Sequence, residues 1–188
     1  TALYTLQGLG ALDESSVLTA LMDSDAIVRV HALRVAESLV AQSVAITNRF
    51  SNMTTDRNIQ VRYQLAFSLG AAQGQSRNQA LVQLALSDHS DKWMQVAISS
   101  SLFQGANFVF RELTTQDAFL KTTNGQQFML MLATQIGTRK RTDELAGVLQ
   151  SLSNIKERDP TLAPKIIEAL VKNIEGERRT RLLATTGE

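Results

Sequence analysis

The sequence lacks cysteine altogether, and it has only two prolines, two histidines and 5% aromatic residues among its 188 residues. Without cysteine the chain has no disulfide framework, no thiolate nucleophile and no thiolate metal site. It also has no apolar run long enough to cross a bilayer, so we expect no membrane insertion. The low aromatic content disfavours a β-sandwich, whereas 44% hydrophobic residues suffice for a helical core. These features predict an all-α protein.

The sequence also lacks an excess of one charge sign, because it contains nineteen Lys and Arg residues and eighteen Asp and Glu residues. A formal net charge of +1 creates no global field that would attract nucleic acid or an anionic membrane. Two local basic clusters occur at 139–141 and 178–181, and acidic residues accompany them at Glu144, Glu175 and Glu177. We interpret both clusters as solvated surface, which argues against nucleic acid as the partner.

The sequence does contain a repeat of 33 residues. Asp25, Asn58 and Asp91 lie at this spacing, and a Val-Arg pair ending in Arg29 or Arg62 follows in the first two copies. Asp and Asn are preferred helix N-caps, because their side-chain oxygen accepts a hydrogen bond from an amide of the first turn. We therefore predict a helix after each cap, and we expect each arginine to reach the acidic cap of a neighbouring repeat.

Each predicted helix carries a wide apolar stripe and follows another amphipathic segment. In the first copy the stripe comprises Ile27, Val28, Val30, Leu33, Val35 and Leu39. The preceding segments lie at 17–22, 46–53 and 80–86, and we interpret them as the first helices of helical pairs. One such pair cannot bury its apolar faces alone, so neighbouring pairs are expected to stack into an α-solenoid with a continuous core.

Residues 22–39 (MDSDAIVRVHALRVAESL) and 56–70 (DRNIQVRYQLAFSLG) resemble HEAT repeats, including HEAT-like repeats of the phycobilin-lyase type. The resemblance covers residues 13–105 and implies a superhelix of antiparallel helical hairpins. The opening residues 1–25 are similar to the HEAT module of large secreted bacterial dehydrogenase–cytochrome fusion proteins. That similarity implies a periplasmic or other extracytoplasmic location and a neighbouring redox domain. No Cys-x-x-Cys-His is present, so a haem-binding part is not included.

After Gly105 the period ends. We expect one domain over residues 1–188, with regular repeats over 1–105 and irregular helical pairs over 106–188. The predicted helices of the second part lie at 106–113, 115–123, 126–136 and 142–154, and a last one begins after Asp159-Pro160. The Thr-Thr-Asn-Gly run at 122–125 is expected to stop a helix, as are Gly137 and Gly176. Pro164 leaves the start of the last helix open, since an interior proline costs about 3 kcal/mol.

The segment 177–188 is expected to be a charged tail or the beginning of another repeat. The chain starts with Thr1 inside a predicted helix, without an initiator Met or a signal peptide. We therefore expect it to be a fragment of a longer protein.

No set of residues predicts catalysis, a metal site or a cofactor. Six Asp or Asn residues lie at or near the repeat spacing, namely Asp23, Asp25, Asp56, Asn58, Asp88 and Asp91. Catalysis needs one carboxylate pair in one cleft, so we interpret this recurring set as caps. His89 lies in the turn with Asp88 and is interpreted in the same way. Trp93 and His31 have no repeat-level explanation, and they are therefore our candidates for partner binding.

The sequence thus predicts a non-catalytic scaffold that binds a protein or a neighbouring domain, with the redox domain as one such neighbour. Two alternatives stay open. The first is a nucleic-acid-binding HEAT-like protein similar to certain DNA glycosylases, which would need a basic stripe with facing aromatic residues. The second is a lyase-like small-molecule enzyme, which would need a deep pocket with converging titratable groups. The oligomeric state is not predicted.

Overall fold

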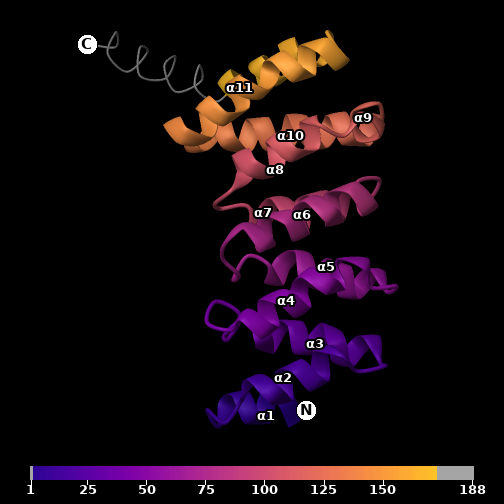
Figure 1. Ribbon diagram of the computed structural model, residues 1–188, viewed down its shortest axis with the longest axis vertical. Coiled ribbons are helices and arrows are strands. Elements are labelled where there is room, and N and C mark those ends of the chain that lie inside the picture. The colour runs from indigo at the N-terminus through magenta and orange to yellow at the C-terminus, as the bar shows by residue number, and fades with distance from the viewer. Residues whose placement is uncertain (1, 173–188) are drawn as a thin grey trace, which may run out of the picture. The chain divides into compact units, whose positions relative to one another are not determined.

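A computed structural model describes residues 2–172, and within this range the chain forms helices and turns with no β-strand (Figure 1). The prediction of an all-α protein is therefore confirmed for the described residues. The helices are Ala2–Gly8 (α1), Glu14–Leu21 (α2), Ala26–Ala36 (α3), Val44–Asn52 (α4), Met53–Thr55 (η1, a 3₁₀ turn), Ile59–Ser68 (α5), Gln75–Asp88 (α6), Lys92–Ser101 (α7), Ala106–Thr114 (α8), Asp117–Leu120 (α9), Thr123–Arg139 (α10), Thr142–Arg158 (α11) and a further helix that includes residues 162–172.

The chain divides into two compact units, and the first ends at Gln104. This is also where the 33-residue period ends. Unit 1 therefore contains the repeats, and unit 2 begins at Gly105 with α8.

Unit 1 consists of helical pairs whose members contact their counterparts in the next pair. The first helices α2, α4 and α6 contact one another in chain order, and the second helices α3, α5 and α7 do the same. Figure 1 shows these helices stacked in the order of the sequence. In this arrangement the N-terminus of α3 lies next to that of α5, and the N-terminus of α5 lies next to that of α7.

An N-cap residue fixes the start of each second helix. Asp25, Asn58 and Asp91 each have extended backbone, and their side-chain oxygens accept a hydrogen bond from the amide two residues later at 2.8 Å. These contacts satisfy amides that have no partner within the helix. The first residues of α3, α5 and α7 are thus set by the caps that the repeat predicts.

The core of unit 1 lies between the two rows of helices. Leu33, Leu65 and Met94 are fully buried there, one from each second helix. The apolar stripe that the sequence indicates is wider than the buried face, because Ile27 is 66% exposed. A period of 3.6 residues predicts a broad apolar face, but only contacts decide which of its edges meets solvent.

Arg77 joins the ends of two second helices from its place on α6. Its guanidinium donates to the carbonyl oxygen of Leu69 at 2.9 Å, to that of Gln104 at 2.9 Å and to that of Ser101. The carbonyl groups of Leu69 and Ser101 lie at the ends of α5 and α7, where helices leave acceptors without partners, and that of Gln104 lies in the loop after α7. One buried side chain therefore caps both helices.

Unit 2 corrects two predictions about its helix ends. The run at 122–125 does not stop a helix, because Thr122 is the N-cap of α10 and its hydroxyl oxygen accepts from the amide of Gly125 at 2.9 Å. Gly137 does not end a helix either, since α10 continues to Arg139. A Cβ on Gly137 would overlap the carbonyl oxygen of Leu170, so this glycine allows two helices to approach closely.

The remaining expectations for unit 2 are met in part. The predicted helix at 115–123 shortens to the single turn α9, whereas the helix at 142–154 extends to Arg158. Pro164 lies in the first turn of the helix that includes 162–172, where no intrahelical amide bond is lost. Gly176, the basic residues at 178–181 and the predicted tail at 177–188 lie outside the described residues. Among residues 2–172, no helix combines the length and the apolar character that crossing a bilayer requires.

Shortening a buried leucine of the second-helix row tests this packing. We expect Leu33→Ala to lower the free energy of unfolding by about 2–5 kcal/mol, because it removes apolar contacts and leaves a cavity. Urea unfolding measures the change. Met22→Ala is the control, since the Met22 side chain is exposed and should change stability by less than about 0.5 kcal/mol. A loss below about 1 kcal/mol for Leu33→Ala would contradict the assignment of the helix faces.

Candidate functional site

Buried ion pairs connect the starts of successive second helices in unit 1. Arg29 of α3 donates from Nε and Nη2 to the two carboxylate oxygens of Asp56, both at 2.8 Å. Its Nη1 also donates to the backbone carbonyl oxygens of Asp23 and Ser24. The side chains of Arg29 and Asp56 are 7% and 9% exposed, so water screens this pair little.

The second arginine of the repeat makes the same contact one step further along. Arg62 of α5 donates from Nε and Nη2 to both oxygens of Asp88 at 2.7 Å, and from Nη1 to the carbonyl oxygen of Asp56. The neighbouring Tyr63 donates its hydroxyl proton to Asp91, the cap of α7. Burial, followed by this hydrogen bond, raises the pKa of Tyr63 to about 12. Two adjacent residues of α5 thus hold the turn before α7.

These contacts correct the predicted pairing. Each arginine does reach an acidic residue at the start of the next repeat, but Asp56 and Asp88 are not the N-caps; they precede the caps Asn58 and Asp91. Asp56 also accepts a hydrogen bond from the amide of Asn58 at 2.9 Å, so it connects the cap to the arginine of the previous repeat. Asp88 is not a cap, because it is the last residue of α6. In the third copy Gln95 replaces the arginine and donates to the carbonyl oxygen of His89.

The pKa of Asp56 reflects two opposing effects. Burial raises it, but hydrogen bonds from Arg29 and from the amide of Asn58, together with the positive charge of Arg29, lower it further than burial raises it. The net pKa lies below the ordinary value of 3.8. Asp56 is therefore ionised at neutral pH and serves the ion pair, not proton transfer.

His31, one of the two predicted partner-binding residues, has a partner inside the chain. Its Nδ1 lies 2.9 Å from the hydroxyl oxygen of Tyr4, and the two rings meet edge to face with centroids 5.5 Å apart. Tyr4 belongs to α1, so this contact joins α1 to α3. The structure gives His31 a packing role that the repeat could not predict, because α1 precedes the regular copies.

Trp93, the other predicted partner-binding residue, projects into solvent. It is 66% exposed, the same fraction as Ile27, which occupies the equivalent position two repeats earlier. The Nζ atom of Lys92 lies 5.4 Å from the centroid of the Trp93 ring. With this exposure, Trp93 is not packed over an inter-helix loop.

Trp93 belongs to an exposed apolar surface that sequence reasoning missed. We define the second-helix face as Ile27, Val30, Phe67, Trp93 and Val96, which lie at positions two, five and nine after the helix caps. These offsets of three and seven residues place side chains on one side of each helix. Phe67 and Val96 are about half exposed, and Val30 is less so. A shallow groove of about 240 Å³ lies on this face, between α3 and α5, and is lined by Ala26, Ile27, Val30, Asn58 and Gln60.

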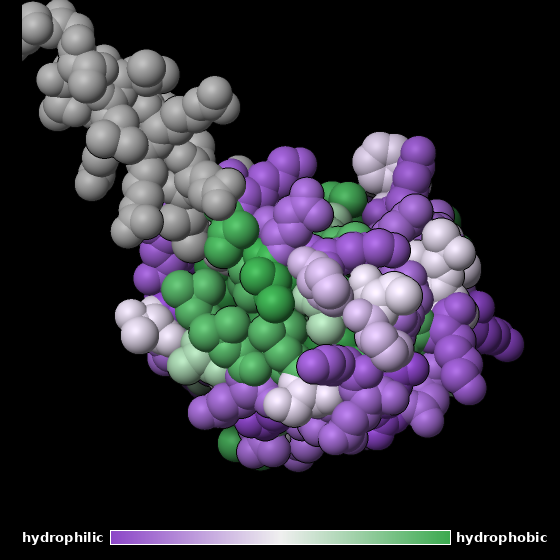
Figure 2. Space-filling view, turned by 90° about the horizontal axis from the view of Figure 1, so that it is seen from above, coloured by the Kyte–Doolittle hydropathy of each residue, from purple (hydrophilic) through white to green (hydrophobic). Residues whose placement is uncertain are grey.

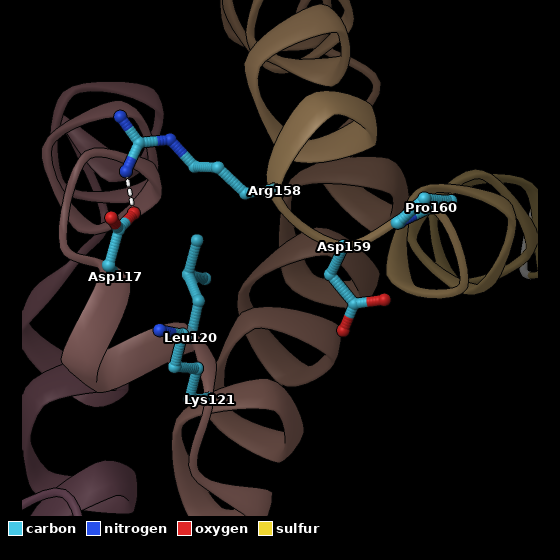
Figure 3. Close-up of a pocket in the computed structure, with 6 residues that line it drawn as sticks. All are labelled: Asp117, Leu120, Lys121, Arg158, Asp159 and Pro160. Atoms are coloured by element: carbon cyan, nitrogen blue, oxygen red, sulfur yellow. Dashed lines mark ion pairs between the residues drawn. The ribbon is translucent and has the colours of Figure 1, made fainter.

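Unit 2 carries a different hollow, between α9 and the end of α11 (Figure 3). It has a volume of about 310 Å³ and is lined by Asp117, Leu120, Lys121, Arg158, Asp159 and Pro160. Figure 3 shows Arg158 paired with Asp117 across its rim. Asp159 is held by the amide of Thr161 and by Gln126, each at 2.9 Å.

The chemistry of this hollow is limited. Hydrogen bonds from the Thr161 hydroxyl and amide lower the pKa of Asp159, so it is ionised at neutral pH and is not a proton donor. Asp117 is engaged by Arg158. Lys121 is the cation of the lining that has no carboxylate partner among the described residues. The hollow offers a place for a small anion, but its lining contains no hydroxyl or thiol nucleophile.

Unit 2 also exposes an apolar area. Figure 2 shows apolar side chains gathered on the face of unit 2 seen from above, and Leu149 and Ile167 of the last two helices are about half exposed.

Glu144 is the one acidic residue in the described part of the chain whose carboxylate is buried without a hydrogen bond. It lies in the first turn of α11. Burial raises its pKa above the ordinary value of 4.5, and the positive charges of Arg139 and Arg141 oppose the rise only in part. Within residues 2–172, no group of three or more His, Cys, Asp or Glu residues is placed to hold a metal ion.

Comparisons with protein-family models, with curated proteins and with solved structures find no match for this chain. The resemblance to HEAT repeats therefore depends on the residues quoted above.

Removing one member of a buried ion pair tests the connection between repeats. We expect Asp56→Ala to lower the free energy of unfolding by about 3–5 kcal/mol, because it leaves the Arg29 guanidinium buried without its counter-charge. Urea unfolding measures the loss. The matched control is Glu112→Ala, which breaks the exposed pair with Arg111 and should change stability by less than about 1 kcal/mol. Equal effects of the two substitutions would contradict the structural role of the buried pair.

The raised pKa of Glu144 predicts a pH effect of defined sign. The folded state binds this proton more tightly than the unfolded state, so the stabilisation is complete below the ordinary Glu pKa. It is lost as the pH rises through the raised pKa. We expect Glu144→Gln to be more stable than the wild type at pH 7, and the difference to shrink toward pH 4. Urea unfolding from pH 4 to 8 measures both, and a wild-type advantage at pH 7 would show that the carboxylate is stabilised by contacts.

Proposed function

We propose that this chain is a non-catalytic scaffold that binds a protein or a neighbouring domain of its own polypeptide. In this proposal the helical pairs form an α-solenoid of HEAT-like hairpins. The observation that carries the proposal is the second-helix face, where apolar side chains are exposed at equivalent positions of α3 and α7, with Phe67 of α5 between them. Support also comes from the acidic residues of unit 1, because they are engaged as caps and ion-pair partners.

An exposed tryptophan is the strongest feature of this surface. Tryptophan is enriched among the interface residues that contribute most to binding, because it buries a large area with few rotatable bonds. Trp93 also has an apolar counterpart at the equivalent position, Ile27. A single exposed apolar residue needs no explanation, whereas an aligned set on stacked helices is typical of a binding surface.

The surface is also held rigidly. Trp93 is the second residue of α7, and its amide donates to the cap Asp91, which Tyr63 of α5 holds from the other side. The Trp93 backbone is therefore fixed relative to α5 before any partner binds. A preorganised surface loses less conformational entropy on binding, which favours affinity.

The resemblance to HEAT modules of dehydrogenase–cytochrome proteins suggests which neighbour such a scaffold would serve. In this proposal the array spaces or docks a redox domain outside the cytoplasm. A gene that encodes neither a propeller-type dehydrogenase domain nor a cytochrome domain next to this segment would remove that part of the proposal and leave protein binding intact.

Selection from a random peptide library displayed on phage tests protein binding directly. We expect peptides to be enriched on the whole chain and to lose at least tenfold in affinity on the Trp93→Ala variant. Because the chain has a single tryptophan, a blue shift of its fluorescence on titration reports contact at this position. The matched control is Leu149→Ala, which removes an exposed apolar side chain from unit 2 and should leave affinity unchanged.

Circular dichroism verifies that both variants keep their helices, as exposed positions should allow. Recovery of no peptide, or of peptides that bind the Trp93→Ala variant equally well, would contradict the assignment of the second-helix face as the binding surface.

A further inference from the structure

We infer that the second-helix face binds a second copy of this chain, with Trp93 of each copy placed in the groove between α3 and α5 of the other. This inference rests on the proposed function, because it names the protein that the same surface binds. It is carried by an exposed side chain and a groove that occur together on one face, since a surface with both can be complementary to its own copy.

The groove has the size and the chemistry to hold an indole ring. Its volume is about 240 Å³, whereas a cavity of about 150 Å³ is already large enough for a benzene molecule. Ala26, Ile27 and Val30 of α3 form its apolar lining. On the α5 side it is lined by Gln60, whose exposed side-chain amide has no hydrogen bond to another described residue. The amide oxygen of Gln60 can therefore accept a hydrogen bond from the indole N–H, which acts only as a donor.

Trp93 can enter the groove of a second copy but not that of its own chain. Trp93 lies at the start of α7, and the groove lies near the starts of α3 and α5. Packed helices lie about 8–10 Å apart, so roughly 12–15 Å along the row separates Trp93 from its own groove. A rotation of 180° about an axis parallel to α5 exchanges α3 with α7 and keeps the helix starts together. This rotation places each Trp93 opposite the groove of the other copy.

The same rotation brings the remaining apolar residues of the face together. Phe67 of α5 lies close to the axis, so it meets Phe67 of the second copy. Aromatic pairs are favourable at ring-centroid separations of about 4.5–7 Å. Val96 meets Val30 of the second copy. Phe67 and Val96 are about half exposed in a single chain, so these contacts remove apolar surface from water.

The charges beside the face also suit a copy of the same surface. Charged side chains of both signs lie there, namely Asp23, Asp25, Glu37, Asp91, Arg34, Arg57 and Lys92. A face of one sign would repel its own copy, whereas a face of mixed sign does not. The ammonium group of Lys92 lies 5.4 Å from the Trp93 ring and accompanies it to the groove. There the acidic Asp23 and Asp25 precede Ala26 of the groove lining, so opposite charges meet beside each indole.

The face is small for a dimer interface. Three helices about 8–10 Å apart and about 15 Å long present roughly 400–500 Å² in each copy. The two copies together bury roughly 800–1,000 Å², which is at the lower end of the range for specific association. We therefore expect a weak and reversible dimer whose population rises with protein concentration.

Sedimentation velocity of the whole chain at increasing concentration tests the inference. We expect a monomer–dimer equilibrium, with a blue shift of the fluorescence of the single tryptophan as the dimer forms. Trp93→Ala should weaken dimerisation by about tenfold or more. Ile27→Lys should do the same, because it fills the groove and places a positive charge opposite Lys92. The matched control is Leu149→Ala, which removes an exposed apolar side chain of unit 2 and should leave the dimer unchanged.

Mixing the two variants tests the reciprocal contact. A Trp93→Ala copy keeps its groove and an Ile27→Lys copy keeps its tryptophan, so a heterodimer of the two retains one of the two contacts. Neither homodimer retains any. The heterodimer should therefore form roughly threefold or more tightly than either homodimer, as measured by sedimentation with one variant carrying a fluorescent label. Circular dichroism verifies that both variants keep their helices.

Three results would overturn the inference. They are a wild-type chain that stays monomeric up to about 1 mM, a dimer that Trp93→Ala leaves unchanged, and mixed variants that associate no better than each variant alone.

The phage selection separates this inference from the proposed function. A monomer that selects Trp93-dependent peptides would overturn the inference and leave the proposed function standing. A Trp93-dependent dimer would support the inference, and recovery of no peptide by that dimer would identify the second copy as the occupant of the face. A monomer that recovers no Trp93-dependent peptide would overturn both.

Discussion

The buried pairing of an arginine with the acidic turn of the next repeat is the constraint on which unit 1 depends. Arg29 and Arg62 each use three nitrogen atoms, two on a carboxylate and one on backbone carbonyl groups, of which Arg29 contacts two and Arg62 one. A planar guanidinium makes such a contact only in one orientation, so the pair fixes both the separation and the rotation of neighbouring second helices. Asp56 then holds the amide of Asn58, which begins α5. The turn at 56–58 therefore contains both the ion-pair partner of Arg29 and the N-cap of α5.

The same constraint explains how the exposed surface is presented. The arginine faces the core, so side chains two positions before it on the helix and one position after it point toward solvent. Ile27 and the partly exposed Val30 occupy these positions beside Arg29. Beside Arg62 they are occupied by Gln60, which is exposed, and by Tyr63, which is half-buried with its hydroxyl on Asp91. In the third copy Gln95 replaces the arginine, yet Trp93 and Val96 keep the positions on either side of it. The exposed face therefore continues one repeat beyond the ion pairs.

Local chemistry was predictable from the sequence, and long-range contacts were not. Caps such as Asp25 could be predicted because an N-cap interacts with its own helix. The partner of Arg29 could not be identified, since several carboxylates lie within reach of a flexible side chain at a repeat boundary. The sequence does not distinguish the two roles open to Thr122, because the turn residues Thr and Asn occur both after one helix and at the start of the next. Gly137 predicts a helix end from local preference alone, whereas the close approach of the Leu170 carbonyl oxygen requires a glycine within α10. The exposure of Ile27 depends on packing that periodicity does not describe.

Arg77 limits how such a chain could grow by duplication of its repeats. A copied 33-residue segment would reproduce the caps and the arginine–aspartate pairs, since both belong to the period. Arg77 lies on α6 and caps α5 and α7 together, so a segment taken from elsewhere in unit 1 would leave the ends of its second helices uncapped. New repeats inserted within the row would need another donor to cap the C-terminal ends of their second helices. Repeats added before α2 would leave the contacts of Arg77 with the ends of α5 and α7 unchanged.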